Sequence, residues 1–90
     1  MSVKVNIPTP MRPHTDNQAT VEAAGATVQA VLDDLARRFP AITQRLFDNG
    51  QLRRFVNLYL NEEDIRYLDN LKTAVKDGDE LSIIPAVAGG

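Results

Sequence analysis

The strongest strand signal in the chain is the stretch Phe55-Val56-Asn57-Leu58-Tyr59-Leu60. Successive side chains of a strand point to opposite faces, so one face carries Val56, Leu58 and Leu60. The other face carries Phe55, Asn57 and Tyr59. A strand with one aliphatic face needs another layer of structure to cover that face. The stretch therefore predicts a sheet that is covered on one side and open on the other.

The same alternation predicts two strands near the start of the chain. The first spans residues 3–7, with Lys4 and Asn6 on the open face, and the second spans residues 19–23. Pro8 ends the first strand, because proline has no backbone N–H to donate to a ladder. We expect the two strands to form a hairpin joined by a long polar loop.

One amphipathic helix is expected to cover the sheet. Apolar residues recur at helical spacing from Val28 to Phe39, and Thr27 occupies the N-cap position. Pro40 predicts the end of this helix, because proline disfavours helical backbone in the residue before it. A further short turn of helix is expected over residues 41–47.

The C-terminal third supplies the remaining elements. We expect a charged turn at residues 61–64, a short strand or extended segment over 65–68, and a brief turn or 3₁₀ turn at 69–71. A tight turn at 77–79 should then lead to a last strand over 81–84 that ends at Pro85. This order predicts an α+β fold, with a mixed sheet of four to five strands wrapped around one main helix. The first and last strands should lie parallel at its centre, because the elements between them provide the long crossover.

Composition excludes several classes of function. Ninety residues make one small domain, and the absence of cysteine excludes disulfides, a cysteine-based zinc site and a nucleophilic thiol. The net charge of −2 and the scattered basic residues argue against a nucleic-acid partner. The single histidine, His14, lacks the companions of a metal site. No stretch is apolar enough for a membrane span and no leader is evident, so we expect a cytoplasmic protein.

The chain stops at Gly89-Gly90, directly after the last predicted strand. Terminal glycines bury no side chain and lose the most backbone freedom when ordered, so they do not serve the fold. They are either a frayed terminus or a slim reactive end that enters the active site of another protein. We expect residues 1–84 to form the folded domain and residues 85–90 to form a mobile tail, which spans about 20 Å when extended.

Several of these motifs together resemble the ubiquitin-like sulfur carriers of the MoaD/ThiS family, which have the β-grasp fold. The resemblance covers nearly the whole chain and depends on residues 55–61, on Asp77-Gly78-Asp79-Glu80-Leu81 and on the ending Ile84 to Gly90. The ending Pro-Ala-Val-Ala-Gly-Gly, with the loop from Ile7 to Arg12, is most similar to the CysO branch, which supplies sulfur for cysteine biosynthesis.

The resemblance implies a carrier without catalytic residues, bound cofactor or metal. An E1-like enzyme would use ATP to adenylate the carboxylate of Gly90, and a sulfur donor would convert it to a thiocarboxylate. Gly89, Ala88 and Val87 would thread into the partner. In the CysO branch a PLP-dependent cysteine-synthase-like enzyme takes the sulfur, and a metalloprotease then releases cysteine.

The body of the domain must also contact these partners, because ordering a tail costs on the order of 1–2 kcal/mol per residue. By strand alternation Phe55, Tyr59 and Ile84 face outward, and we expect them to form an apolar docking patch. The alternative is that these three side chains pack on each other or on arginines. Arg53 and Arg54 either steer an acidic partner or only solubilise the surface. Arg12 either braces its loop or touches a partner.

Three other functions remain open at this point. The chain is also compatible with the small subunit of molybdopterin synthase, whose tail would insert into the large subunit. It is compatible with a ubiquitin-like tag that is joined to lysines through Gly90. A plain β-grasp binding module would not need Gly89 or Gly90 at all.

Overall fold

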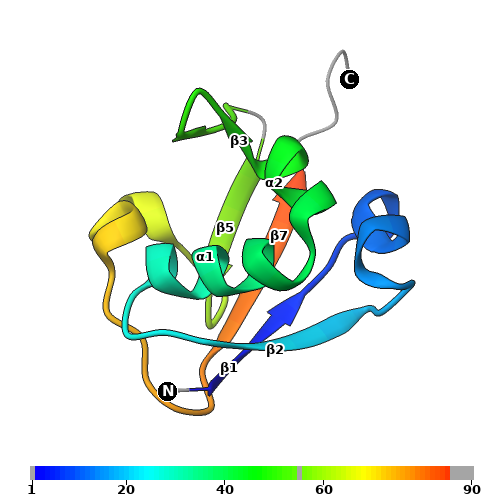
Figure 1. Cartoon of the computed structure of the whole chain (residues 1–90). Helices are drawn as coiled ribbons and strands as arrows, with labels where there is room; N and C mark the ends of the chain where they lie inside the picture. The colour runs from blue at the N-terminus through cyan, green and yellow to red at the C-terminus, as the bar shows by residue number, and fades with distance from the viewer. Residues whose placement is uncertain (1, 55, 86–90) are drawn as a thin grey trace.

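Five strands form one mixed sheet in the order β2-β1-β7-β5-β6, and the computed structural model describes residues 2–54 and 56–85 (Figure 1). The strands are β1 (Ser2–Asn6), β2 (Thr20–Ala24), β5 (Val56–Leu60), β6 (Glu63–Asp64) and β7 (Glu80–Pro85). β1 and β7 pair in parallel at the centre of the sheet, with Val5 opposite Leu81. The predicted central pair is therefore confirmed, and the other pairings in the sheet are antiparallel.

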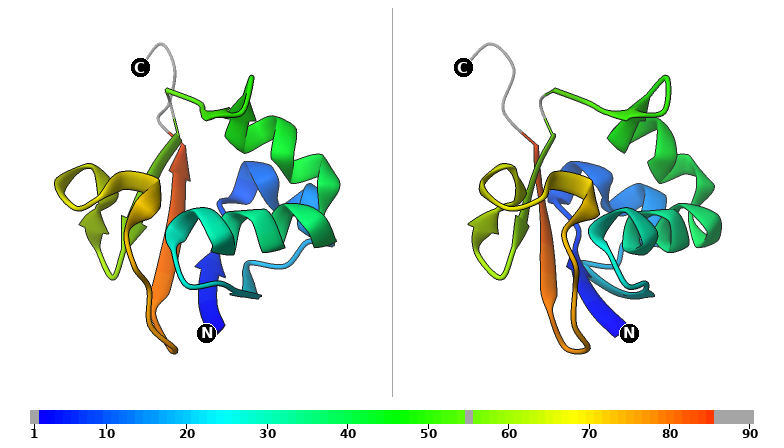
Figure 2. Two further views of the ribbon diagram at one scale, coloured as in Figure 1. Left: turned by 60° about the vertical axis from the view of Figure 1, so that its left-hand side comes forward. Right: turned by 90° about the vertical axis from the view of Figure 1, so that its left-hand side faces the viewer.

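One face of the sheet is covered by α1 (Val28–Arg38), as predicted (Figure 2). Thr27 caps the helix, because its side-chain oxygen accepts a hydrogen bond from the backbone N–H of Ala30 at 3.1 Å. The helix ends at Arg38, and Pro40 is the first residue of α2 (Pro40–Leu46). Proline suits that position, because the first helical N–H has no partner within a helix.

The core lies between the sheet and these two helices. Its fully buried side chains include Val31, Leu32 and Leu35 of α1 and Ile42 and Leu46 of α2. The sheet contributes the alternating buried residues Val3, Val5, Val56, Leu58, Leu60, Leu81 and Ile83, and Ile7, directly after β1, is buried with them. These side chains form one continuous cluster, which is how a chain of this length stabilises a single domain.

Gly25 lies where the end of β2 passes the start of α1. A Cβ atom at this position would lie 2.6 Å from the backbone nitrogen of Val31 and 2.8 Å from the carbonyl carbon of Ala30. Both neighbours are backbone atoms that cannot move aside cheaply. The glycine therefore permits the close contact between β2 and α1.

The predicted strand or extended segment over residues 65–68 is wrong, because residues 65–67 form a 3₁₀ helix. The strand in this region is β6, at Glu63–Asp64, and it is followed by the 3₁₀ helices η2 (Ile65–Tyr67) and η3 (Asn70–Lys72). Asn61 and Glu62 form a tight turn with positive φ angles of 50° and 72°, which reverses the chain two residues earlier than expected. The 3₁₀ turn near residue 71 was expected.

Three further segments differ from the sequence prediction. The loop after β1 contains a 3₁₀ helix, η1 (Thr9–Thr15), in which Met11 and Thr15 are buried. Residues after α2 form a small hairpin of β3 (Phe47–Asp48) and β4 (Gln51–Leu52). β7 also runs one residue further than predicted, because Pro85 still pairs with Val56.

Candidate functional site

The residues predicted for the reactive tail, Val87, Ala88, Gly89 and Gly90, lie outside the described part of the chain, and so does Phe55. The structure describes the two other members of the predicted docking patch, Tyr59 and Ile84. It also describes the end of the sheet from which the tail continues. These two regions form the candidate site.

Tyr59 and Ile84 lie on the open face of the sheet, as predicted. Tyr59 pairs with Ser82 across the β5–β7 ladder, and Ile84 lies two residues further along β7. This register makes Tyr59 and Ile84 diagonal neighbours on one face, a spacing that large side chains can bridge. Tyr59 is half-buried, whereas Ile84 remains 46% exposed. An aromatic and an aliphatic side chain thus lie together on a surface that no element of the described chain covers.

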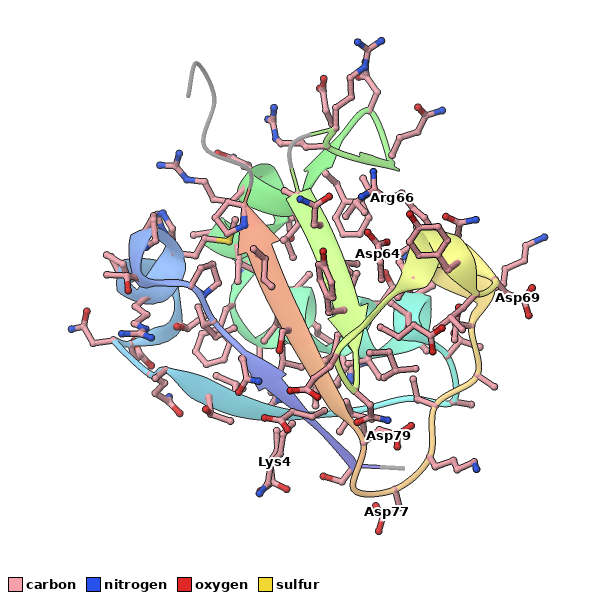
Figure 3. The ribbon with its side chains drawn as sticks, turned by 180° about the vertical axis from the view of Figure 1, so that it is seen from behind. Lys4, Asp64, Arg66, Asp69, Asp77 and Asp79 are labelled. Carbon is pink, nitrogen blue, oxygen red and sulfur yellow. The ribbon has the colours of Figure 1, made fainter. Side chains whose placement is uncertain are left out.

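The rest of the open face is polar (Figure 3). The Asn6 amide Nδ2 donates to Glu80 Oε2 at 2.9 Å and to Ser82 Oγ at 3.0 Å. Thr20 Oγ1 donates to Asn6 Oδ1 at 3.3 Å, so the network crosses β2, β1 and β7. The apolar pair of Tyr59 and Ile84 is therefore confined to β5 and β7, and the part of the open face formed by β1 and β2 is polar.

The tail begins at one end of the sheet. Pro85 is opposite Val56, the first residue of β5, so β7 ends where β5 starts. The same end of the molecule is built by α2, the β3–β4 hairpin and η1, which packs against α2 (Figures 1 and 2). A partner that receives the tail must therefore also face these elements.

Asp64 and Arg66 form a close pair beside β5 that sequence reasoning missed (Figure 3). The Arg66 side chain donates to Asp64 Oδ2 at 2.7 Å, and its backbone N–H donates to Asp64 Oδ1 at 2.9 Å. The Arg66 side-chain bonds, followed by this backbone bond, lower the pKa of Asp64. Asp64 belongs to an acidic run that appeared to be only a charged turn, yet its side chain is 6% exposed. Arg66, two residues after Asp64, was the feature of the sequence from which this ion pair could have been predicted.

Two further features of this region were not predicted. Tyr67, at the end of η2 and next to Arg66 in the sequence, is 82% exposed. A hollow of about 170 Å³ lies at the edge of β5 and is lined mainly by Leu52, Val56, Leu58, Ile65 and Leu71. No periodic pattern of residues predicts the exposed Tyr67 or this hollow, because both depend on how the two 3₁₀ helices fold back on β5.

The described residues contain neither a metal-binding cluster nor a membrane-spanning helix. Within 2–54 and 56–85, no three histidine or acidic side chains are grouped closely enough to hold a metal ion. In the same part of the chain, no helix has both the length and the apolar composition needed to cross a bilayer. The described site is therefore a surface that carries the apolar pair Tyr59 and Ile84 close to the end of β7.

Comparison with known proteins agrees with this geometry. The model of the ThiS family matches residues 5–90. The sulfur carrier protein CysO of Mycobacterium tuberculosis is 50% identical over 93 residues, which cover 100% of both chains. In the crystal structure of an Amycolatopsis orientalis BexX/CysO complex, a chain of 50% identity superposes with a TM-score of 0.91 and covers 98% of this chain and 99% of its own. Small archaeal modifier protein 3 of Haloferax volcanii is 38% identical over 65 residues, which cover 72% of this chain and 71% of its own.

The fold is thus that of the ubiquitin-like β-grasp proteins, a five-stranded mixed sheet around one main helix. The chain belongs to the ThiS family, within which it is similar to the CysO sulfur carriers over its full length.

Proposed function

We propose that this chain is a sulfur-carrier protein, and that the α-carboxyl group of Gly90 carries the sulfur. The observation that carries the proposal is the full-length identity of 50% to proteins described as sulfur carriers. The absence of cysteine is consistent with it, because the sulfur must then be held at a carboxyl group and not at a side chain. The chain acts as a protein cosubstrate and not as an enzyme.

The chemistry follows from the state of a free carboxyl group. An α-carboxyl has a pKa of about 3.3–3.7, so it is ionised at neutral pH and is a poor electrophile. An E1-like partner would activate it by forming a mixed anhydride with AMP, which releases pyrophosphate from ATP. Attack by a sulfur nucleophile on the carbonyl carbon would then expel AMP and leave a thiocarboxylate. ATP binds to the partner in this scheme and not to the carrier.

The open face supplies the contacts that a thin tail cannot provide. Tyr59 and Ile84, together with Phe55, would dock the activating enzyme and then the acceptor enzyme. Apolar and aromatic side chains that are exposed together are typical of protein interfaces. The patch is close to Pro85, so one partner can hold the face and the tail at the same time.

The acceptor would be a PLP-dependent cysteine-synthase-like enzyme, and a metalloprotease would release cysteine and restore Gly90. The similarity to CysO proteins supports this assignment. A complex between BexX and a CysO protein supports a role in which the carrier docks on other proteins.

Intact mass spectrometry tests the proposal directly. The chain is incubated with ATP, a sulfide source and the activating enzyme of its own organism, and one oxygen should be replaced by one sulfur. Oxidation of either of the two methionines gives a nearly equal mass change, so the sample is also treated with a thiol-directed alkylating reagent. Because the chain has no cysteine, a single alkyl group reports the thiocarboxylate alone.

A variant that is extended by one alanine after Gly90 provides the matched control. Its body and its docking face are unchanged, but the glycine carbonyl is no longer a free acid. Alkylation should be absent in this variant. Equal alkylation of both proteins would overturn the assignment to Gly90.

A role as a protein-modifying tag is the second candidate, favoured by the 38% identity to small archaeal modifier protein 3. It predicts covalent conjugates of the chain with lysines of other proteins, visible by immunoblot and lost when Gly90 is extended. A role as the small subunit of molybdopterin synthase predicts instead a stable complex with the large subunit.

A further inference from the structure

Four arginines belong to segments at the end of the domain where β7 stops: Arg12, Arg45, Arg53 and Arg54. Arg12 belongs to η1, which follows β1, and Arg45 belongs to α2. Arg53 and Arg54 lie just before β5, whose first residue, Val56, pairs with Pro85. The parallel register of β1 and β7 places Ile7, which binds Arg12, level with Ile83. We call these four residues the arginine collar.

Three of the collar side chains are fixed by hydrogen bonds from Nε. Arg12 Nε donates to the carbonyl oxygen of Ile7 at 3.1 Å, and Arg53 Nε donates to that of Gln44 at 2.8 Å. Arg45 Nε donates to His14 Nε2 at 3.2 Å. Because Nε is the inner nitrogen of the guanidinium, these bonds orient each side chain and leave the terminal nitrogens for an outside acceptor.

None of the four collar guanidiniums forms an ion pair with a carboxylate in residues 2–54 and 56–85. The other three arginines do, since Arg37 and Arg38 pair with Asp34, and Arg66 pairs with Asp64. Two carboxylates belong to the same elements: Asp48 shares a surface hollow of about 240 Å³ with Arg53 and Arg54, and Asp16 is the C-cap of η1. The collar therefore keeps a positive excess in a chain whose net charge is −2.

Acidic side chains outnumber basic ones at the opposite end of the sheet, where Lys4 lies opposite Glu80 and Lys76 lies just before the turn that leads into β7. Asp77 and Asp79 lie in the turn that leads into β7, and Glu80 is the first residue of that strand (Figure 3). Glu62 lies in the neighbouring turn after β5. The domain is thus electrically polarised along β7, with its positive end at the base of the tail.

We propose that the arginine collar binds carboxylates of a partner protein, arranged around the mouth of the channel that receives the tail. The inference rests on the proposed function, because it assumes that the tail enters a partner. Guanidinium groups bind carboxylates through two parallel hydrogen bonds, and opposite charges accelerate encounter. The four side chains come from three separate segments at the end of the sheet where β7 stops, which suits several protein carboxylates better than a single phosphate group.

The first test measures association with the activating enzyme at several salt concentrations. The variant Arg53→Gln/Arg54→Gln should lower the association rate constant roughly tenfold at low salt and flatten its salt dependence. The matched control is Lys72→Gln/Lys76→Gln, which removes the same charge from exposed positions outside the collar. A control that loses as much rate as the collar variant would overturn the proposal, because net charge alone would then explain the effect.

The second test does not depend on the proposed function. Arginine Nε–H resonances are followed by NMR while a hexaglutamate peptide is added, and in a parallel sample inorganic phosphate is added at equal ionic strength. The peptide should shift the Arg12, Arg45 and Arg53 signals and leave Arg37 and Arg66 unchanged. Equal or larger shifts with phosphate would overturn the assignment to a protein partner.

The two tests separate the collar from the sulfur-carrier role. If the wild-type chain is not converted to a thiocarboxylate but its collar signals respond to the peptide, the proposed function fails and the collar stands. If the collar variant associates and is converted as the wild type at all salt concentrations, the collar fails and the carrier role stands.

Discussion

Asn61 and Asp79 join two turns that are far apart in the sequence: Asn61 Nδ2 donates to Asp79 Oδ1 at 3.1 Å. The other carboxylate oxygen of Asp79 accepts the backbone N–H of Lys76 at 2.7 Å. Asn61 in turn accepts the backbone N–H of Glu80 at 3.0 Å through its side-chain oxygen. The turn after β5 is thereby fixed to the turn that starts β7, and this holds the two strands in register.

The Asp79 carboxylate should make stability depend on pH. The backbone N–H of Lys76, followed by the Asn61 side chain, lowers the pKa of Asp79, and the pKa values of Asp34 and Asp64 are lowered as well. A carboxyl group whose pKa is lowered by folding stabilises the folded state at pH values above its pKa in the unfolded chain, which is about 3.9. This stability is lost as the pH falls through the pKa of the group in the folded state. We expect the free energy of unfolding to be level down to about pH 5 and to fall below about pH 4.

Asp79→Asn tests the contribution of this one carboxylate. The amide keeps one acceptor oxygen and loses the other, so the variant should be less stable than the wild type at neutral pH. The two urea unfolding curves should converge as the pH is lowered, because the wild type also loses its charge. A constant difference between the curves at every pH would show that the charge of Asp79 contributes nothing.

Docking on the open face is tested by Tyr59→Ala and Ile84→Ala. Each should lower kcat/KM for thiocarboxylate formation roughly tenfold, as loss of an interface residue worth about 1.4 kcal/mol would do. Lys4→Ala is the control, because Lys4 is exposed on the same face but lies opposite Glu80, at the far end of β7. Unchanged rates in both variants, with far-UV circular dichroism showing an intact fold, would remove the docking role.

The cap of α1 should be measurable as a stability difference. Thr27→Ala removes the acceptor for the Ala30 N–H and should cost about 1 kcal/mol in the free energy of unfolding. Thr27→Ser keeps the hydroxyl group and should restore most of this loss. The measurement is urea denaturation of the wild type, Thr27→Ala and Thr27→Ser. Equal unfolding midpoints for the two variants would contradict the capping role of Thr27.

Two large side chains, Leu32 and Tyr67, should differ in their contribution to the free energy of unfolding because they differ in burial. Leu32 is 0% exposed, and Leu32→Ala should lower the free energy of unfolding by about 2–5 kcal/mol. Tyr67 is 82% exposed, and Tyr67→Ala should change it by less than about 0.5 kcal/mol. A comparable loss in the Tyr67 variant would show that this ring packs on the domain in solution.

The regular elements could be predicted because their side chains have a clear period. Alternation placed Val56, Leu58 and Leu60 inward and Tyr59 outward, and helical spacing located α1 with its Thr27 cap. The parallel pairing of β1 and β7 followed from topology alone. These predictions depend on one face of each element being buried.

The irregular parts could not be predicted, because long-range contacts decide them. η1 lies in a segment with three prolines, and Met11 becomes buried only because α2 packs against it. β6 has two residues, too few for any period, and Asp64 is buried because Arg66 satisfies its carboxylate. The collar was missed as a group for the same reason, since Arg12, Arg45 and Arg53 lie in separate segments that only the fold brings to the same end of the domain.

The parallel arrangement of β1 and β7 has a practical consequence for labelling. Ser2 begins β1 at the opposite end of the sheet from Pro85, in a domain whose longest dimension is 33 Å (Figure 1). A fluorophore or purification handle attached ahead of Ser2 would therefore project from the acidic pole. Such reporters can follow binding without obstructing the end of the sheet where Pro85 lies, whereas a handle placed after Gly90 would, under the proposed function, remove the reactive carboxyl group.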